Sequence, residues 1–320
     1  MSSQLWKPRF TGTLVIVPAI LLSACETKGP QVAVADAPMC RVAQEPTLLP
    51  TDLPESSGVA VSRTHPDVIW THNDSGSQPE LFALTGRGEL IAAVHPAGGE
   101  MEDWEDLALA ACGAGDCLYI GDIGDNNAER SEITVYRILE PAPGQDSAAV
   151  SQAFTMRYPD GPQDSEGLFV LPGEQLHIVT KGGHGSIGIY RYPGSLADAR
   201  GTAEALEMEL VRSLSNGVVP ISDRVTGAAA SADGKWVALR TYTTAMLYSA
   251  DELLGSGPAP SPATIDLRML SEAQGEAVAF GPEGSLVLTS EGGAQELPGM
   301  LSILWCEALA APSQAPTPAD

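Results

Sequence analysis

The sequence predicts an all-β protein folded as a single β-propeller. Short apolar runs separated by turn residues fill residues 39–307. Five of these runs repeat one pattern at intervals of roughly fifty to sixty residues. Units of about fifty residues with four strands each are the signature of a propeller. We expect five four-stranded blades, and six is the alternative if one of the longer units contains a further blade.

The five repeated segments are the expected innermost strands. They read SGVAV from Ser57, EDLAL from Glu105, EGLFV from Glu166, TGAAA from Thr226 and EAVAF from Glu276. Their small residues suit strands that crowd around a narrow channel. Second strands are expected at residues 68–72, 118–123, 176–181, 236–242 and 286–289, third strands at 81–84, 133–138, 187–192 and 245–248, and fourth strands at 90–94, 153–158, 205–214 and 264–270. Residues 195–210 are the best helix candidate, and they suit a strand equally well.

The last unit lacks a fourth strand of its own. We expect residues 41–49, from the N-terminal side, to pair beside residues 302–305 and close the ring. A bond between Cys40 and Cys306, at the two ends of the folded region, supports this closure, and Cys112 and Cys117 flank one hairpin turn. With Cys25 set aside, four cysteines allow three pairings, among which the sequence alone does not choose. A thiolate metal site is the competing interpretation, but no Cys-x-x-Cys pair is present.

The two ends of the chain carry signals of their own. Lys7 and Arg9 precede a short apolar run, and the segment ending at Cys25 reads Leu-Ser-Ala-Cys, which resembles a bacterial lipobox. We expect residues 1–24 to be a lipoprotein signal peptide, Cys25 to carry the lipid, and the protein to be exported and anchored to the cell envelope. Glu26 favours the outer membrane in a Gram-negative cell, and an ordinary signal peptide is the alternative. Residues 25–38 are expected to form a polar tether and residues 308–320 a disordered tail.

The charge limits the possible partners. The net charge is −24, and loss of the basic signal peptide makes it more negative. A nucleic-acid partner is excluded, because phosphates need a basic face. Calcium and cationic ligands remain compatible, although solubility alone also explains an acidic surface. We expect a monomer that touches the membrane only through the lipid on Cys25.

One face of the propeller is expected to hold the functional groups. The first and second strands of each blade are antiparallel, so the start of one and the end of the other lie at the same mouth of the channel. This mouth gathers Glu55, Ser57, His72, Asn73, Asp74, Asp103, Trp104, Glu105, Asp106, Asp122, Asp125, Asn126, Asp164, Glu166, Lys181, Arg224, Thr226, Arg240, Gln274, Glu276 and Glu291. Glu105, Glu166 and Glu276 hold one repeat position, so their carboxylates converge and repel unless they are compensated.

Two kinds of compensation are open. Lys181 and Arg240 form ion pairs with the glutamates in one interpretation. In the other, a calcium ion is held by several of Glu105, Asp122, Asp125, Glu166 and Glu276, because calcium takes carboxylate oxygens. Turn chemistry competes with a functional role for the HNDSG segment of residues 72–76 and for residues 122–127. Trp104 is expected either to pack between blades or to wall the ligand pocket.

The combined motifs carry a resemblance. HNDSG (72–76), DWED (103–106), GDIGDN (121–126), YPDG (158–161), DSEG (164–167) and QGEA (274–277) resemble a group of exported bacterial proteins of presumed propeller fold. The likeness covers roughly residues 52–306 and implies the fold and the exported context, but no reaction. More distantly, the arrangement is similar to calcium-dependent propeller hydrolases, namely lactonases, phosphotriesterases and phytases, which is an analogy of fold alone.

Two functions are compatible with these features. In the first, the protein hydrolyses an ester, lactone or phosphoester with calcium at the mouth, and His72 acts as general base. Asn73, Asp74, Trp104, Lys181 and Arg240 then contact the ligand. In the second, the same mouth binds a small molecule or an envelope partner without turning it over.

Overall fold

The computed structural model describes residues 40–310, apart from residues 75, 77, 99–101, 114, 200–203 and 294–296. Over these residues the regular structure is mostly strand, with only short helical turns, which confirms the all-β prediction. The longest helix among them is α1 (Ala250–Leu254), and none is long and apolar enough to cross a membrane. The expected signal peptide and tether lie outside the described residues. So does the expected tail from residue 311 onward, whereas its first residues belong to the 3-10 turn Glu307–Leu309.

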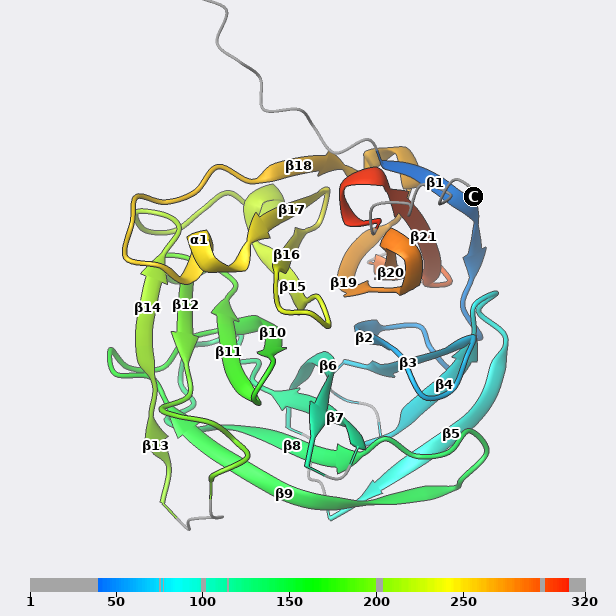
Figure 1. Ribbon diagram of the computed structural model, residues 1–320, viewed down its shortest axis with the longest axis horizontal. Helices are drawn as coiled ribbons and strands as arrows, with labels where there is room; N and C mark the ends of the chain where they lie inside the picture. Colours follow the sequence, from blue (N-terminus) through cyan, green and yellow to red (C-terminus); the bar gives the residue numbers. More distant parts are fainter. Residues whose placement is uncertain are drawn as a thin grey trace, which may run out of the picture. The chain divides into compact units, whose positions relative to one another are not determined.

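Each repeat folds as a four-stranded antiparallel meander (Figure 1). The first contains β2 (Ser56–Val61), β3 (Val68–Asn73), β4 (Leu81–Thr85) and β5 (Leu90–Ala97), and the second β6 (Trp104–Cys112), β7 (Gly115–Asp122), β8 (Ile133–Leu139) and β9 (Ser147–Arg157). The third contains β10 (Ser165–Leu171), β11 (Gln175–Thr180), β12 (Gly188–Arg191) and β14 (Glu209–Ser213). The fourth contains β15 (Val225–Ala230), β16 (Trp236–Thr241), β17 (Thr244–Ser249) and β18 (Ala263–Asp266). The fifth contains β19 (Gln274–Phe280), β20 (Ser285–Glu291), β21 (Met300–Cys306) and β1 (Cys40–Leu48).

Two expected elements differ in detail. The strand expected at 264–270 ends at Asp266, and residues 267–270 form a 3-10 turn instead. Asp266 caps this turn by accepting a hydrogen bond from the backbone N–H of Arg268, and the turn buries Leu267 and Leu270. The described part of 195–210 contains no helix, and residues 206–207 form β13 (Leu206–Glu207), which pairs with β9.

The five innermost strands form a closed ring. Contacts run from β2 to β6, β10, β15 and β19 and then back to β2, an arrangement typical of a β-propeller. Five separate hydrophobic clusters lie between successive meanders rather than in one central core. Each interface between successive meanders is therefore packed by its own hydrophobic cluster.

The N-terminal segment closes the ring as expected. β1 pairs antiparallel with β21, and Cys40 faces Cys306 in that register. Both expected disulfides are confirmed, Cys40–Cys306 and Cys112–Cys117. The first joins residues that are 266 positions apart in the sequence, so both ends of the folded region are fixed in the same sheet.

The outer strands of three meanders are also joined to one another. Residues His95–Ala97 of β5 pair in parallel with Ser147–Ala149 of β9, and β13 pairs in parallel with the other end of β9. The first two meanders thus form one continuous sheet, to which β13 adds a short strand. Figure 1 shows β9 as a long strand along the outer edge of this side.

Candidate functional site

A β-bulge recurs at one position in all five innermost strands. The pairing of each innermost strand with its neighbour shifts register at this point, which leaves one extra residue on the innermost strand. The bulges include the repeated positions Ser57, Glu105, Glu166, Thr226 and Glu276. A bulge bends a strand and redirects a side chain, and such bulges are frequent beside functional sites. The sequence repeat at the mouth is therefore a repeat of backbone geometry.

The two hydroxyl members of this set hold neighbouring strands together. The Ser57 hydroxyl donates to the backbone carbonyl of Glu105 at 2.6 Å, and the Thr226 hydroxyl donates to that of Glu276 at 2.9 Å. Both bonds are buried and join successive meanders. The backbones that carry Glu105 and Glu276 are thus each fixed by the adjacent meander.

The residues after the bulges pack around the centre of the ring. Gly58, Gly167 and Gly227 leave no room for a side chain: a Cβ on Gly227 would lie 2.7 Å from the carbonyl oxygen of Glu276. Ala277 and Asp106 hold the other two positions, and the carboxylate of Asp106 accepts backbone hydrogen bonds from Leu107, Leu168 and Ala228 at 2.7 to 3.0 Å. These donors belong to β6, β10 and β15, so one buried carboxylate joins three innermost strands.

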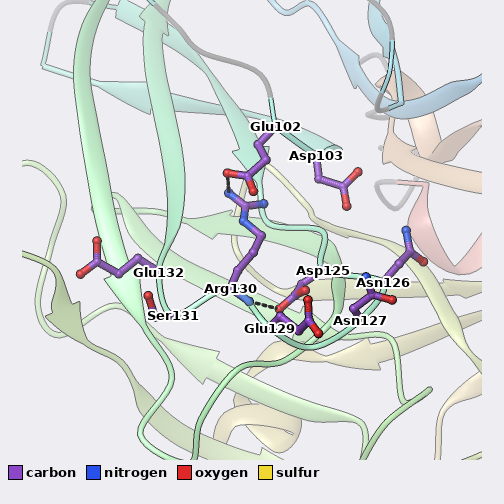
Figure 2. A pocket seen from close by; sticks show the side chains of 9 residues that line it. All are labelled: Glu102, Asp103, Asp125, Asn126, Asn127, Glu129, Arg130, Ser131 and Glu132. Carbon is purple, nitrogen blue, oxygen red and sulfur yellow. Dashed lines mark hydrogen bonds and ion pairs between the residues drawn. The ribbon is translucent and has the colours of Figure 1, made fainter.

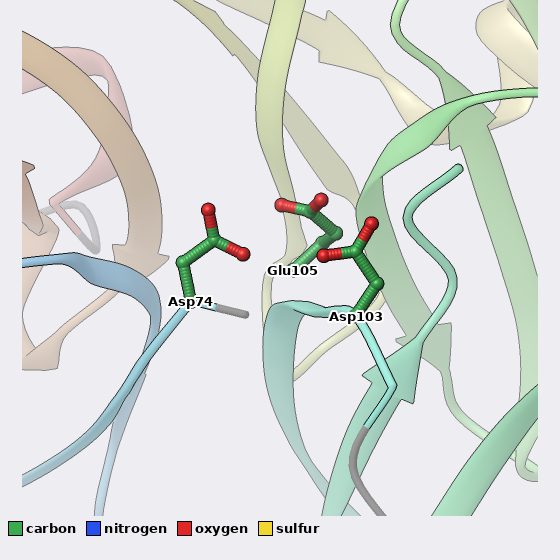
Figure 3. Close-up of side chains that lie close together, drawn as sticks. All are labelled: Asp74, Asp103 and Glu105. Carbon is green, nitrogen blue, oxygen red and sulfur yellow. The ribbon is translucent and has the colours of Figure 1, made fainter. Parts of the chain in front are cut away.

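Three carboxylates converge at the mouth (Figure 3). Asp74 follows β3, Asp103 precedes β6, and Glu105 is the bulge residue of β6. One oxygen from each carboxylate lies within 4.8 Å of the others. Gly124 makes this approach possible, because a Cβ there would overlap the carboxylates of Asp103 and Glu105. The group contains Glu105, an expected calcium ligand, and Asp74, which is expected to contact the bound molecule. Its third member is Asp103, which the sequence places at the mouth without a role.

Burial of these acids is electrostatically unfavourable. Burial raises the pKa of Glu105 well above its ordinary value, and the charges of Asp74 and Asp103 raise it further. The positive charge of Lys181 lowers this pKa, and Glu276 raises it. Because two of the three bulge glutamates act on each other in this way, they belong to one electrostatic site.

Glu276 and Glu291 form a second acidic pair at the mouth. The side-chain amide of Gln274 donates to both, at 2.7 Å to Glu276 and 2.6 Å to Glu291. Burial and the charge of Glu291 raise the pKa of Glu276 well above its usual value. Burial, with the charges of Asp74 and Glu55, raises the pKa of Glu291 to about 7. A carboxyl group that titrates near neutral pH is able to take up or release a proton under physiological conditions.

Glu166 differs from the other two bulge glutamates. It forms an ion pair with Lys181, and Asp164 lies 4.0 Å from the same ammonium group. Lys181 also lowers the pKa of Glu105 and Glu276. The ammonium group therefore moderates the acidic mouth while it neutralises Glu166 directly.

Asp122 and Asp125 have structural partners in the loops. Asp122 accepts from the backbone N–H groups of Glu102 and Asp103 and forms an ion pair with Arg130 at 2.8 Å. Asp125 accepts from the backbone N–H of Arg130 at 2.7 Å. Neither belongs to the three-carboxylate group, and both fix the loops that carry Asp103 and Gly124.

A pocket of about 620 Å³ opens beside these loops (Figure 2). Its lining is polar and mostly acidic, and consists of Glu102, Asp103, Asp125, Asn126, Asn127, Glu129, Arg130, Ser131 and Glu132. Figure 2 shows Arg130 extended between Glu102 and Asp125. Asp103 lines this pocket and also belongs to the three-carboxylate group. The pocket and the carboxylate group therefore adjoin.

His72 is buried instead of facing the mouth. No part of its side chain is exposed, its Nδ1 lies 2.9 Å from the carbonyl oxygen of Asn73, and its ring packs edge-on against Trp104. Burial lowers its pKa to about 4, so the ring is neutral at pH 7. This placement does not support the expected role as general base, because no solvent or substrate reaches the ring. Trp104 is likewise fully buried and packs between the first two meanders.

Two other expected ligand contacts are occupied by the protein itself. Asn73 accepts from the backbone N–H of Glu55 and donates to the carbonyl of Asp52, so its amide fixes the segment that precedes β2. Arg240 is fully buried, pairs with Glu272 and donates to the carbonyls of Ala277 and Thr289. Its guanidinium group is enclosed by the protein, and its charge lowers the pKa of Glu276.

Comparison with known proteins identifies no family. No family model matches the sequence, and no curated protein matches it. Among solved structures, a PQQ-bound aldose sugar dehydrogenase from Streptomyces coelicolor is similar at 12% identity and a TM-score of 0.48, over 84% of this chain and 98% of that one. A gluconolactonase from Xanthomonas campestris is similar at 15% identity and a TM-score of 0.41, over 84% and 99%. A luciferin-regenerating enzyme is similar at 11% identity and a TM-score of 0.44, over 84% and 95%. Likenesses this distant carry no conclusion about the chemistry of this chain.

Proposed function

We propose that this protein is a calcium-dependent hydrolase of an ester, lactone or phosphoester, built as a five-bladed β-propeller. The convergence of Asp74, Asp103 and Glu105 within 4.8 Å carries the proposal. Five meanders around one closed ring of innermost strands support the blade number.

The donor set fits calcium by its chemistry and spacing. All three side chains offer hard carboxylate oxygens, which calcium prefers. Oxygens that bind one calcium ion at about 2.3–2.6 Å lie at most about 5 Å apart, and this group meets that limit. A cation at this point removes the repulsion that raises the pKa of Glu105.

The residues around the three-carboxylate group would supply the other functions that hydrolysis needs. A bound calcium ion would polarise a carbonyl or phosphoryl oxygen. Glu291 replaces His72 as the candidate general base, because it stands at the mouth with a pKa of about 7. Gln274 orients Glu291 through its amide at 2.6 Å. The pocket between Glu102 and Glu132 supplies the space for the rest of the substrate.

The cellular setting remains that expected from the N-terminal sequence. Cleavage before Cys25 and lipidation of its sulfur would anchor the protein to the cell envelope, and to the outer membrane in a Gram-negative cell. Replacement of Cys25 by Ser should move the protein from the membrane fraction to the soluble fraction. Unchanged partitioning of this variant would refute lipid anchoring.

A binding module without catalysis is the second candidate. The burial of His72 favours it, because the imidazole that the sequence offers as general base does not reach a bound ligand. The two candidates share the calcium site and differ in turnover. Measured hydrolysis that disappears in Glu291→Gln, with calcium binding retained, would favour the enzyme.

Calorimetric titration tests the shared site. Calcium is titrated into chelator-treated protein, and the double variant Asp103→Asn/Glu105→Gln is compared with wild type. We expect binding in wild type and its loss in the variant, together with loss of any calcium-induced rise in Tm. Glu89→Gln, at an exposed turn, is the matched control. Equal calcium affinity in wild type and the double variant would refute the site, and a panel of esters, lactones and phosphoesters then tests turnover.

A further inference from the structure

Arg224 is a cation at the mouth that forms no ion pair within the described part of the chain. It directly precedes β15, and its guanidinium group rests against the backbone of Gly183, where a Cβ would lie 3.4 Å from Cζ. Its Nε is buried without a hydrogen-bond partner, and the guanidinium group makes no ion pair with any described residue. This is unexpected in so acidic a protein, since Lys181, Arg130 and Arg240 each pair with a carboxylate.

Tyr242 places Arg224 within the acidic site. Tyr242 follows β16, so it occupies the second-strand end of the same meander. Burial raises the pKa of its phenol, and the charges of Glu276 and Glu291 raise it further, whereas Arg224 lowers it. The phenol thus lies in the field of both the acidic pair and the guanidinium group. It stays protonated at neutral pH and is able to donate a hydrogen bond.

We propose that Arg224 and Tyr242 recognise an anionic oxygen group, a carboxylate or a phosphate, on the ligand that occupies the mouth. The proposal rests on the proposed function for the position of the reacting bond, and it specifies the substrate class. A guanidinium group binds such oxygens through parallel N–H donors, and a neighbouring hydroxyl adds a third donor.

The acidic surroundings are compatible with an anionic ligand. Glu276 is held toward its neutral form and accepts a hydrogen bond from Gln274. Glu166 is neutralised by Lys181. A calcium ion on Asp74, Asp103 and Glu105 would offset the remaining negative charge. The ligand then meets a metal on one side of the mouth and a guanidinium group on the other, which favours an ester, lactone or phosphoester that carries a separate negative charge.

Anion titrations test this assignment. Inorganic phosphate and succinate are titrated separately by calorimetry into calcium-loaded and chelator-treated protein, and the two anions distinguish phosphate from carboxylate recognition. We expect at least one anion to bind wild type, and Arg224→Gln to weaken it about ten-fold or more, as expected for loss of charge-assisted hydrogen bonds. Arg224→Lys should bind with intermediate affinity because it keeps the charge without the planar fork. Tyr242→Phe should weaken binding less than Arg224→Gln.

Controls separate this proposal from the proposed function. Arg87→Gln removes an exposed arginine from a turn and should leave anion binding unchanged. The Tm of each variant shows that it folds, and the calcium affinity of Arg224→Gln should stay at the wild-type value or rise slightly. If Arg224→Gln binds the anion as tightly as wild type, or if wild type binds neither anion in either calcium state, the assignment is wrong. Absence of calcium binding would refute the proposed function alone, because the chelator-treated titration still reports on Arg224.

Discussion

Replacement of Glu291 by Gln should stabilise the calcium-free protein at alkaline pH. Burial and neighbouring carboxylates raise the pKa of Glu291 from 4.5 to about 7 in the folded protein. At pH 8 the group is charged in both the folded and the unfolded state, so the folded state bears the full cost of that charge. Gln274 can still donate its hydrogen bond to the neutral amide oxygen of the variant, although this bond is weaker than one to a charged carboxylate.

The expected gain follows from linkage between pKa and stability. One pKa unit corresponds to about 1.4 kcal/mol, so the shift is equivalent to roughly 3 kcal/mol at pH 8. Wild type recovers this stability as the pH falls from about 7 to 4.5, because only the folded state then holds the proton. The variant cannot recover it, so the difference in the free energy of unfolding should shrink toward zero near pH 4.5. For a domain of this size the gain at pH 8 corresponds to a rise in Tm of roughly 5–10 °C.

Denaturant unfolding in the presence of chelator measures this difference at pH 8 and at pH 4.5. Glu89→Gln serves as the control for loss of an exposed carboxylate and should change the free energy of unfolding little at either pH. A difference between Glu291→Gln and wild type that is the same at both pH values, or a loss of stability at pH 8, would falsify the electrostatic account of the mouth.

Three further predictions concern stability. Replacement of Cys40 and Cys306 by Ser should lower the free energy of unfolding by about 5 kcal/mol, and replacement of Cys112 and Cys117 by about 2 kcal/mol. The first loss is larger because the Cys40–Cys306 bond closes a far longer loop. Equal losses in denaturant unfolding would contradict this loop argument. Asp106→Asn should cost about 3 kcal/mol, because its amide cannot accept from all three backbone donors, whereas an unchanged midpoint would show that the three bonds are dispensable. Burial lowers the pKa values of His72 and His177 to about 4. Each should therefore lower the free energy of unfolding by roughly 3 kcal/mol as the pH falls from 6.5 to 4, because only the unfolded state gains the proton in this range. Denaturant unfolding of a His72→Gln/His177→Gln variant, compared with wild type over this pH range, should show that this loss is absent from the variant.

Much of the fold is predictable because the repeat constrains it. The pattern at Ser57, Glu105, Glu166, Thr226 and Glu276 marks the innermost strand of each meander, and alternating apolar runs mark the others. The hairpin turn between Cys112 and Cys117, and the location of Cys40 and Cys306 at the two ends of the folded region, favour the observed pairings without excluding the others. The parallel pairing of β5 with β9 is not predictable, because it depends on how the outer strands of two meanders meet in space.

The candidate site is less predictable because burial decides the role of each polar residue. His72 stands near the end of a second strand, where the repeat places mouth residues, yet the closely packed Gly58 and Trp104 enclose it. Arg240 is likewise polar at the end of a second strand, but its partner Glu272 lies in a loop that no repeat signal marks. Asp103 joins the carboxylate group because Gly124 leaves room for it, and a glycine in a turn does not reveal which side chain it admits.

Successive meanders of the ring contact each other in two ways, and this difference should decide where the ring opens locally. Backbone hydrogen bonds along the outer edge reinforce the interfaces on either side of the second meander, through β5–β9 and β9–β13. At the other three interfaces the described residues show side-chain packing between meanders, without strand pairing across the outer edge. The free energy of local opening should therefore be lowest at those three interfaces between meanders. One of them lies between the first and fifth meanders, which carry Asp74 and Glu276, so the compliant part of the ring borders the acidic mouth.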